Sequence, residues 1–346
     1  MKVLVTHELF ISDCHGGGEI VVFDVTKKLK EAGIEVEVLT TGNPNIKQFD
    51  DIKTIRLPVH RYLMNLAAPW IYKYAKKFDL IQTNNYNACL PSFLAGKWSH
   101  KPVVCLIHGM YTSNWLSMRG PVLGRISKWM EKIQVCHDFD RIIFLSNHAK
   151  KEGIKIGVPE DRIEVIKPGI PRGYKKYKMK DKEQFVLFVG RLAKQKGLDY
   201  LLSAAKELPD IKFVLVGRGE QENRLKSIAP NNVKFLGYLP EEEIIDLYSR
   251  ALVFCLPSVD EGFGLVLIEA MASGCAIVST IPLDYEGIKT DVGNTEQLKN
   301  GIKYLINNPD IALEMGKKNR EEAKNYSWDT FIKKLIKTYE EILAQA

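Results

Sequence analysis

The stretch Pro257–Gly274, PSVDEGFGLVLIEAMASG, decides the fold of this chain. It follows the short apolar run 252–256, which predicts a buried strand. Gly262 and Gly264 mark a turn in which the backbone can approach a ligand closely, and the residues after them suit a helix that ends at the final glycine. A strand, a glycine turn and a helix in this order direct backbone N–H groups and the positive helix end towards an anion.

Two carboxylates in this stretch are its unusual feature. Glu261 precedes the expected helix, whereas Glu269 lies inside it among apolar residues. An acid in such surroundings costs several kcal/mol unless it is hydrogen-bonded or paired. Two interpretations follow: Glu269 pairs inside the core, or both acids accept hydrogen bonds from hydroxyls of a bound sugar nucleotide.

Length and composition indicate an ordinary globular protein. The chain has 346 residues, enough for about two domains, and its 45% hydrophobic and 26% charged content is typical of soluble proteins. The six cysteines are scattered without a C-x-x-C pair, which predicts reduced thiols and a cytoplasmic location. The first residues resemble a strand more than a signal peptide, and no stretch approaches the roughly 18–20 apolar residues of a spanning helix.

Strands and helices alternate in two successive series, which predicts two α/β domains with parallel sheets. The first series occupies 1–168 and the second 184–327. Between them, 169–183 is basic and contains few apolar residues, so it is predicted to be a hinge or linker. The C-terminal helix 328–346 is expected to pack back towards the N-terminal domain.

Several motifs lie where a parallel sheet presents its ligand-binding edge. In the first domain these are the glycine loop Gly16-Gly17-Gly18, which could hold a phosphate, and His108, which ends a strand. Neither motif is specific alone, and a lone histidine is often a structural residue. The chain has no dinucleotide fingerprint, no P-loop and no cluster with zinc-ligand spacing.

In the second domain, Gly190 to Gly197 follows the first strand and carries Arg191 and Lys196. Two cations on a short loop at the carboxyl end of a strand can clamp a diphosphate, although an ordinary solvated loop has the same appearance. Gly217 follows the next strand and offers a turn for a nucleobase. A similar turn precedes Leu239.

Taken in order, these residues resemble the family-four retaining glycosyltransferases, which have the GT-B fold of two Rossmann-like domains facing each other across a cleft. Glu261 and Glu269 match the E-x7-E motif of that family, and the resemblance covers nearly the whole chain. The other matching segments are the early glycine loop, His108, 146–151, 165–170, Gly190-Arg191, Lys196-Gly197 and Val216-Gly217.

The resemblance implies a hexosyltransferase-type enzyme that moves a sugar, with retention, from a UDP- or GDP-sugar to an acceptor hydroxyl. No metal or other cofactor is implied. The domain 1–168 would take the acceptor, and 184–327 would bind the nucleotide sugar. The acceptor would be lipid-linked or a glycan, in the synthesis of glycolipid, glycan or cell-surface polysaccharide.

The resemblance also assigns roles to individual residues. Arg191 and Lys196 would hold the diphosphate and stabilise its charge as it departs, Glu261 would contact the donor sugar, and His108 would lie beside sugar and acceptor. These four are the expected catalytic residues. Glu269 would contact the ribose of the donor. Further donor contacts are expected from Gly16, Gly17, Gly190, Gly217, Leu239, Gly262, Phe263, Gly264 and Leu265.

Two other functions share most of these features. A GT-B sugar-nucleotide epimerase would release a free epimerised sugar without an acceptor, and a non-catalytic protein would only bind a sugar nucleotide or a polyanion. The set of two cations and two carboxylates favours the transferase.

Charge is concentrated in 52–130, which contains 11 Lys or Arg and one acid, Asp79. Large apolar residues are interleaved with these cations, which predicts peripheral contact with an anionic membrane. The alternative is a pair of core helices with solvated basic faces and a soluble polyanionic acceptor. No nucleic-acid-reading motif accompanies the charge, so nucleic acid is not expected as a partner.

Overall fold

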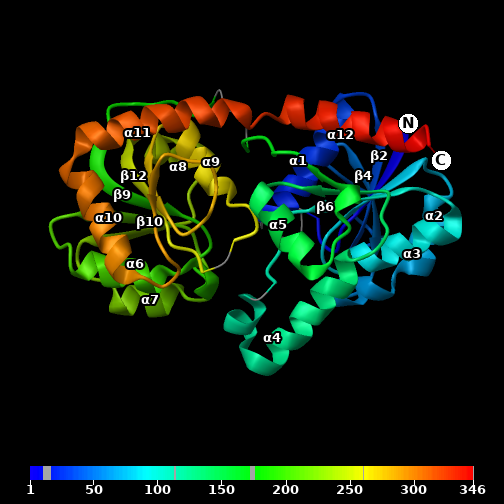
Figure 1. Cartoon of the computed structure of the whole chain (residues 1–346), viewed down its shortest axis with the longest axis horizontal. Helices are drawn as coiled ribbons and strands as arrows, with labels where there is room; N and C mark the ends of the chain where they lie inside the picture. Colours follow the sequence, from blue (N-terminus) through cyan, green and yellow to red (C-terminus); the bar gives the residue numbers. More distant parts are fainter. Residues whose placement is uncertain (11–16, 113, 172–175, 260, 346) are drawn as a thin grey trace. The chain divides into compact units, whose positions relative to one another are not determined.

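The computed structural model describes residues 1–10, 17–112, 114–171, 176–259 and 261–345. It divides into two compact units, one made of Met1–Gly169 and Trp328–Ala346 and the other of Ile170–Ser327. Each unit has a parallel sheet with helices packed around it (Figure 1). The predicted α/β class with two parallel-sheet domains is therefore confirmed.

The first unit is built on an eight-stranded sheet in the order β3-β4-β2-β1-β5-β6-β7-β8. Its strands are β1 Lys2–Thr6, β2 Glu35–Thr41, β3 Gln48–Phe49, β4 Ile52–Leu57, β5 Leu80–Asn84, β6 Val103–Ile107, β7 Arg141–Phe144 and β8 Ile163–Val165. Only the edge strand β3 pairs antiparallel among these described strands, and two residues are too few for a sequence pattern to reveal it. Strands β5 and β6 are buried at every position, as a sheet covered on both faces requires.

The helical elements of this unit surround that sheet. They are α1 Gly17–Glu31, η1 Arg61–Leu66, α2 Ala68–Ala75, α3 Cys89–Ser99, α4 Asn114–Val135, α5 Asn147–Ile156, η2 Glu160–Arg162 and α12 Trp328–Leu343. Helix α12 packs beside α1, although the two lie at opposite ends of the chain (Figure 1). Tyr339 on α12 is fully buried and donates a hydrogen bond to Gln82 of β5, so the C-terminal helix is part of the first unit.

The second unit has a six-stranded, all-parallel sheet in the order β11-β10-β9-β12-β13-β14. Its strands are β9 Glu183–Val189, β10 Lys212–Val216, β11 Val233–Gly237, β12 Ala251–Leu256, β13 Ala276–Ser279 and β14 Gly287–Lys289. Its helical elements are η4 Lys194–Lys196, α6 Leu198–Lys206, α7 Glu222–Ile228, α8 Glu241–Arg250, α9 Leu265–Ala272, α10 Thr295–Asn307, α11 Pro309–Glu322 and η5 Ala323–Asn325. The short β14 was not expected from the sequence.

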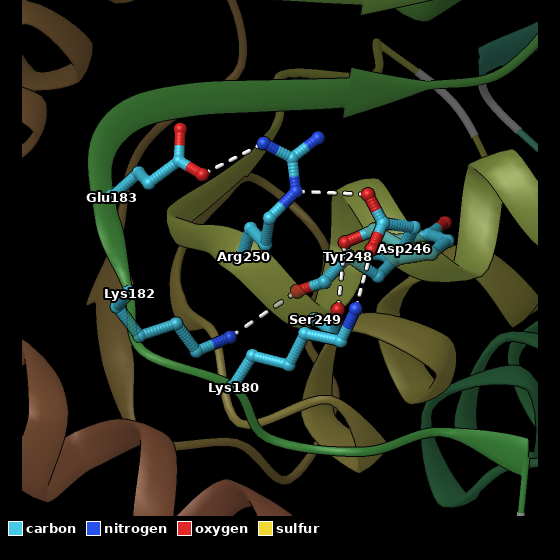
Figure 2. A network of polar contacts seen from close by, with 7 residues as sticks. All are labelled: Lys180, Lys182, Glu183, Asp246, Tyr248, Ser249 and Arg250. Atoms are coloured by element: carbon cyan, nitrogen blue, oxygen red, sulfur yellow. Dashed lines mark hydrogen bonds and ion pairs between the residues drawn. The ribbon is translucent and has the colours of Figure 1, made fainter.

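The described part of the expected hinge, 176–183, packs within the second unit. The Lys182 ammonium donates to the carbonyl oxygens of Tyr248 at 3.2 Å and Ser273 at 2.8 Å. Lys180 pairs with Asp246 at 2.7 Å, and Figure 2 shows this segment alongside the end of α8. Lys180 and Lys182 therefore anchor this part of the segment to the second unit. The domain boundary follows Gly169, and 172–175 lie outside the described residues.

A helix that crosses a bilayer needs about 20 consecutive, mostly apolar residues. No helix in the described ranges is long and apolar enough to do so.

Candidate functional site

Glycines allow the loops at the carboxyl ends of β9, β10 and β11 to approach one another closely. Gly217 has a φ of +133°, and a Cβ atom there would lie 1.9 Å from the carbonyl oxygen of Gly190. The Gly190 amide donates to Val216 at 3.0 Å, and the Gly217 amide donates to Gly237 at 2.7 Å. Gly190 and Gly217, two expected donor-binding positions, are therefore in direct backbone contact.

Lys196 and Glu261 form a hydrogen-bonded ion pair although they are 65 residues apart. Their side chains are only 16% and 15% exposed, and the Ser258 hydroxyl donates to the same carboxylate at 3.3 Å. Gly197 makes the approach possible because it has a φ of +65°, and a Cβ there would lie 2.0 Å from the Pro257 carbonyl oxygen. Two of the expected catalytic residues thus lie in one site.

Arg191 begins the same loop and its side chain is exposed. Among the described residues, its guanidinium has no hydrogen-bond or ion-pair partner, whereas Lys196 is held by Glu261. Arginine presents a fork of N–H donors that matches two oxygens of a phosphate. The loop therefore combines one fixed cation with one whose donors are available to an anion.

The start of α9 adds backbone donors to this site. Gly264 is the residue before the first helical position and has a φ of +86°, a conformation that favours glycine. A Cβ on Gly264 would lie 3.4 Å from the Cγ of Glu261, so the helix begins beside that carboxylate. The first amides of a helix have no partner within the helix, and the helix dipole favours an anion there. Gly264 and Leu265 are thus placed to meet a phosphate.

Glu269 is buried, with 5% exposure, and already has polar partners. The Tyr177 hydroxyl donates to Oε1 at 2.9 Å, and the Tyr248 hydroxyl donates to Oε2 at 3.0 Å. Burial raises the pKa of Tyr248 well above its usual value, and the nearby Glu269 charge adds to the effect. These contacts give Glu269 the structural role that the sequence left open. A contact with ribose would have to be added to them.

His108 lies in the first unit, at the carboxyl end of β6, and its tautomer follows from its neighbour. The Asn84 amide nitrogen donates to the Thr6 carbonyl at 3.1 Å, so Asn84 Oδ1 faces His108 Nε2 at 2.9 Å and accepts a hydrogen bond from its N–H. Nδ1 is left as a hydrogen-bond acceptor, buried and without a partner among the described residues. A substrate hydroxyl is a donor that would suit it.

Burial lowers the pKa of His108 to about 3, and the nearby His7 adds to the shift. A histidine with a lowered pKa binds a proton more readily in the unfolded state. Its contribution to stability is therefore complete above about pH 6.5 and is lost as the pH falls towards about 3.

Replacing His108 by glutamine should accordingly reduce the loss of stability in acid. Between about pH 7 and about pH 4.5, we expect the free energy of unfolding of the variant to fall by about 2 kcal/mol less than that of the unmodified protein. Urea unfolding at the two pH values measures this, with exposed His148 replaced by glutamine as the matched control. Equal losses in all three proteins would contradict the assigned burial of a neutral His108.

His7 is a buried residue that the sequence analysis missed. It directly follows β1, its ring lies edge-on to that of His108 with centroids 6.2 Å apart, and its Nε2 has no partner within the described ranges. Its Nδ1 lies 2.6 Å from the carbonyl oxygen of Leu9 and 3.2 Å from the Leu9 amide nitrogen. Its position in the sequence could have identified it, because His7 and His108 both follow central strands of a parallel sheet.

The other residues that were expected to contact the donor lie in several parts of the structure. Gly262 is half-buried in the turn before α9, and Phe263 is buried beside it. Leu239 is half-buried between β11 and α8, and Gly17 begins α1 in the first unit. Gly16 lies outside the described residues. Across the described part of the chain, no group of three or more His, Cys, Asp or Glu side chains is arranged to hold a metal ion.

Curated relatives match almost the full chain. An uncharacterised glycosyltransferase of Methanocaldococcus jannaschii is 28% identical, over 94% of this chain and 95% of that protein. A phosphatidyl-myo-inositol mannosyltransferase of Mycolicibacterium smegmatis is 26% identical, over 95% of this chain and 91% of that protein.

Solved structures share the fold over their full length. A sucrose-phosphate synthase of Thermosynechococcus elongatus has a TM-score of 0.82 at 20% identity, with 100% of both chains covered. HepE of Anabaena, solved in complex with UDP-glucose, has a TM-score of 0.81 at 20% identity, covering 99% of this chain and 100% of the other. These GT-B glycosyltransferases confirm the predicted fold.

Two family models match consecutive parts of the chain. The one described as Glycosyltransferase Family 4 matches residues 15–173, and the one described as Glycosyl transferases group 1 matches residues 172–322. The chain therefore belongs to the family-four glycosyltransferases.

Proposed function

We propose that the protein is a retaining, metal-independent hexosyltransferase that uses a UDP- or GDP-sugar. The observation that carries the proposal is the arrangement of the second unit. The loop with Lys196 and Arg191, whose guanidinium has no partner among the described residues, contacts the loop with Glu261 and the start of α9. The cations and the helix amides would bind the diphosphate of the donor, and the carboxylate beside them would bind hydroxyls of its sugar.

The chemistry requires stabilisation of a departing anion. As the bond between the anomeric carbon and the phosphate oxygen breaks, negative charge grows on the diphosphate, where Arg191 and Lys196 would stabilise it. Glu261 would accept hydrogen bonds from sugar hydroxyls. The acceptor oxygen would attack from the face that the diphosphate leaves, and the released phosphate would take the acceptor's proton. The residues proposed here need neither a protein nucleophile nor a metal for this step.

The acceptor is proposed to be a lipid-linked or glycan hydroxyl. One relative is named for transfer of mannose to phosphatidyl-myo-inositol, which supports a lipid-borne acceptor for this chain as well. The described cysteines are all free thiols, which suits a reaction on the cytoplasmic side. His108 Nδ1, an acceptor without a partner in the part of the chain that the structure describes, is proposed to receive a hydroxyl of the sugar or the acceptor.

A panel of UDP- and GDP-sugars, assayed for nucleotide release with and without lipid and glycan acceptors, tests this proposal. We expect one donor to release nucleotide in an acceptor-dependent manner, with the anomeric configuration of the donor kept in the product. An epimerase would instead release an epimerised free sugar without any acceptor. Binding of a donor without turnover under every acceptor condition would favour a non-catalytic protein.

Turnover measured in EDTA tests metal independence separately. Turnover should be unchanged, within about twofold, when EDTA replaces added Mg²⁺ or Mn²⁺, because protein cations and helix amides are proposed to carry the diphosphate charge. Loss of activity in EDTA that added metal restores would show that a bound ion shares this role.

A further inference from the structure

Helix α4 presents its apolar side chains to the outside of the protein. Its exposed large apolar residues range from 39% to 66% exposure. They are Leu116, Val122, Leu123, Ile126, Trp129 and Met130, which we call the α4 apolar face. Gly120, with a φ of +75° and a ψ of 177°, interrupts α4 and divides it into two helical segments. From Val122 to Met130 the apolar residues recur at spacings of three and four, so they occupy one side of the second segment. Figure 1 shows α4 projecting from the rest of its unit.

The side of α4 that faces the protein is mostly polar, with Val135 as a buried apolar residue near its end. Ser127, Glu131 and Gln134 are buried there, at spacings of four and three residues. Both carboxylate oxygens of Glu131 accept backbone amides, from Tyr111 at 2.9 Å and Thr112 at 2.7 Å. A surface helix of a soluble protein normally has the opposite arrangement, with apolar residues inward and polar residues outward.

Specific hydrogen bonds fix this inverted orientation. The Gln134 amide donates to Asn65 Oδ1 at 2.6 Å and accepts from the Leu90 amide at 3.3 Å. These bonds would be lost if the helix rotated to bury its apolar face, and Glu131 would leave two amides without their acceptor. The outward position of the α4 apolar face is therefore built into the fold.

The exposed charged side chains of α4 beside this face are all positive. Arg119, Arg125, Lys128 and Lys132 are exposed on α4, whereas Glu131, the one acid in the sequence of α4, is buried. The neighbouring η1, which Gln134 joins to α4, adds exposed Leu63 and Leu66. Pairing with a second copy of the chain would bring cations towards cations. Apolar side chains and a tryptophan flanked by cations instead match the surface of an anionic bilayer.

We propose that α4 is an interfacial helix that inserts its apolar face into the headgroup region of an anionic membrane, with Arg125, Lys128 and Lys132 contacting lipid phosphates. α4 follows His108 closely in the sequence, after the described loop from Gly109 to Thr112, so this surface lies next in sequence to the expected acceptor side. The proposal depends on the proposed function only for the idea that the acceptor comes from this membrane. Membrane binding itself needs no catalysis.

Flotation with lipid vesicles tests the proposal with the full chain. The probes are vesicles of phosphatidylcholine alone and of phosphatidylcholine with phosphatidylglycerol, each at low and high salt. The unmodified protein should bind the anionic vesicles at low salt at least tenfold more strongly than the neutral ones, and high salt should weaken the binding. No binding to anionic vesicles at low salt would overturn the proposal.

Two variants locate the binding surface. Leu123→Ser with Trp129→Ser removes apolar contact, and Arg125→Glu with Lys128→Glu reverses two cations; each should reduce binding to anionic vesicles at least tenfold. The matched controls lie in the second unit, at exposed positions: Ile228→Ser with Tyr304→Ser, and Lys206→Glu with Lys317→Glu. Controls that lose binding equally, or α4 variants that keep it, would overturn the assignment to α4.

Two further readouts separate misfolding and failure of the proposed function. The melting temperature of each α4 variant should stay within a few degrees of that of the unmodified protein, because the changed side chains are exposed. Nucleotide-sugar binding measured without lipid should also be retained. A protein that binds vesicles through α4 but turns over no sugar nucleotide would keep this inference and reject the proposed function.

Discussion

Replacing either Arg191 or Lys196 by alanine should lower the turnover number about a hundredfold or more, as loss of a preorganised charge stabiliser typically does. Both cations lie on the loop that follows β9, and the Gly197 contact holds this loop against the residues that carry Glu261. Their attraction for the diphosphate increases as its charge grows, so the larger part of the effect should fall on the turnover number and a smaller part on KM.

The two variants should differ in stability. Arg191 is exposed and has no partner among the described residues, so its removal should leave the melting temperature unchanged. Lys196 neutralises a carboxylate that is 15% exposed, so its removal leaves Glu261 without its cation and should lower the melting temperature. This difference comes from their pairing and not from their charge, which is the same.

Lys194 provides the matched control for both. It is an exposed cation in the same short helix as Lys196, and no contact places it in the site. Steady-state kinetics of Lys194→Ala should therefore resemble those of the unmodified protein, and Arg191→Lys should recover only part of the activity because a lysine lacks the bidentate fork. Near-normal turnover in both Arg191→Ala and Lys196→Ala would place the diphosphate elsewhere.

The repeating pattern of strands and helices was sufficient to predict both sheets, because buried parallel strands read as apolar runs between helices. Strands such as β3, with two residues, and β14, with three, are too short to give such a pattern. The described part of the expected hinge shows a different limit. Its lysines look solvated in the sequence, but Lys182 reaches carbonyl oxygens some 66 and 91 residues away.

The site was predictable where a motif places residues on loops at the ends of strands, as with Lys196 and Glu261. It was not predictable where partners meet only through tertiary packing. Tyr177 and Tyr248 lie 92 and 21 residues from Glu269, and no spacing rule relates them. Helix α4 shows the same limit, since the sequence reveals its mixture of apolar residues and cations but not which side faces outward.

Glu269 is the residue for which the structural and the donor-binding interpretations make different predictions. Each oxygen of a carboxylate can accept more than one hydrogen bond, so the two tyrosine hydroxyls do not use its full capacity. A ribose hydroxyl that added a charge-assisted hydrogen bond would contribute about 1.5–3 kcal/mol. Replacing Glu269 by glutamine should therefore weaken nucleotide-sugar binding about tenfold to a hundredfold.

Tyr248→Phe is the matched control, because it removes one hydrogen bond to Glu269 and keeps the carboxylate. It should lower the free energy of unfolding by about 1 kcal/mol and leave donor affinity within about threefold of the unmodified value. Calorimetric titration with the donor and thermal unfolding measure the two quantities in each variant. If Glu269→Gln keeps its donor affinity but loses stability as Tyr248→Phe does, the carboxylate serves the core alone and the ribose must be bound by other groups.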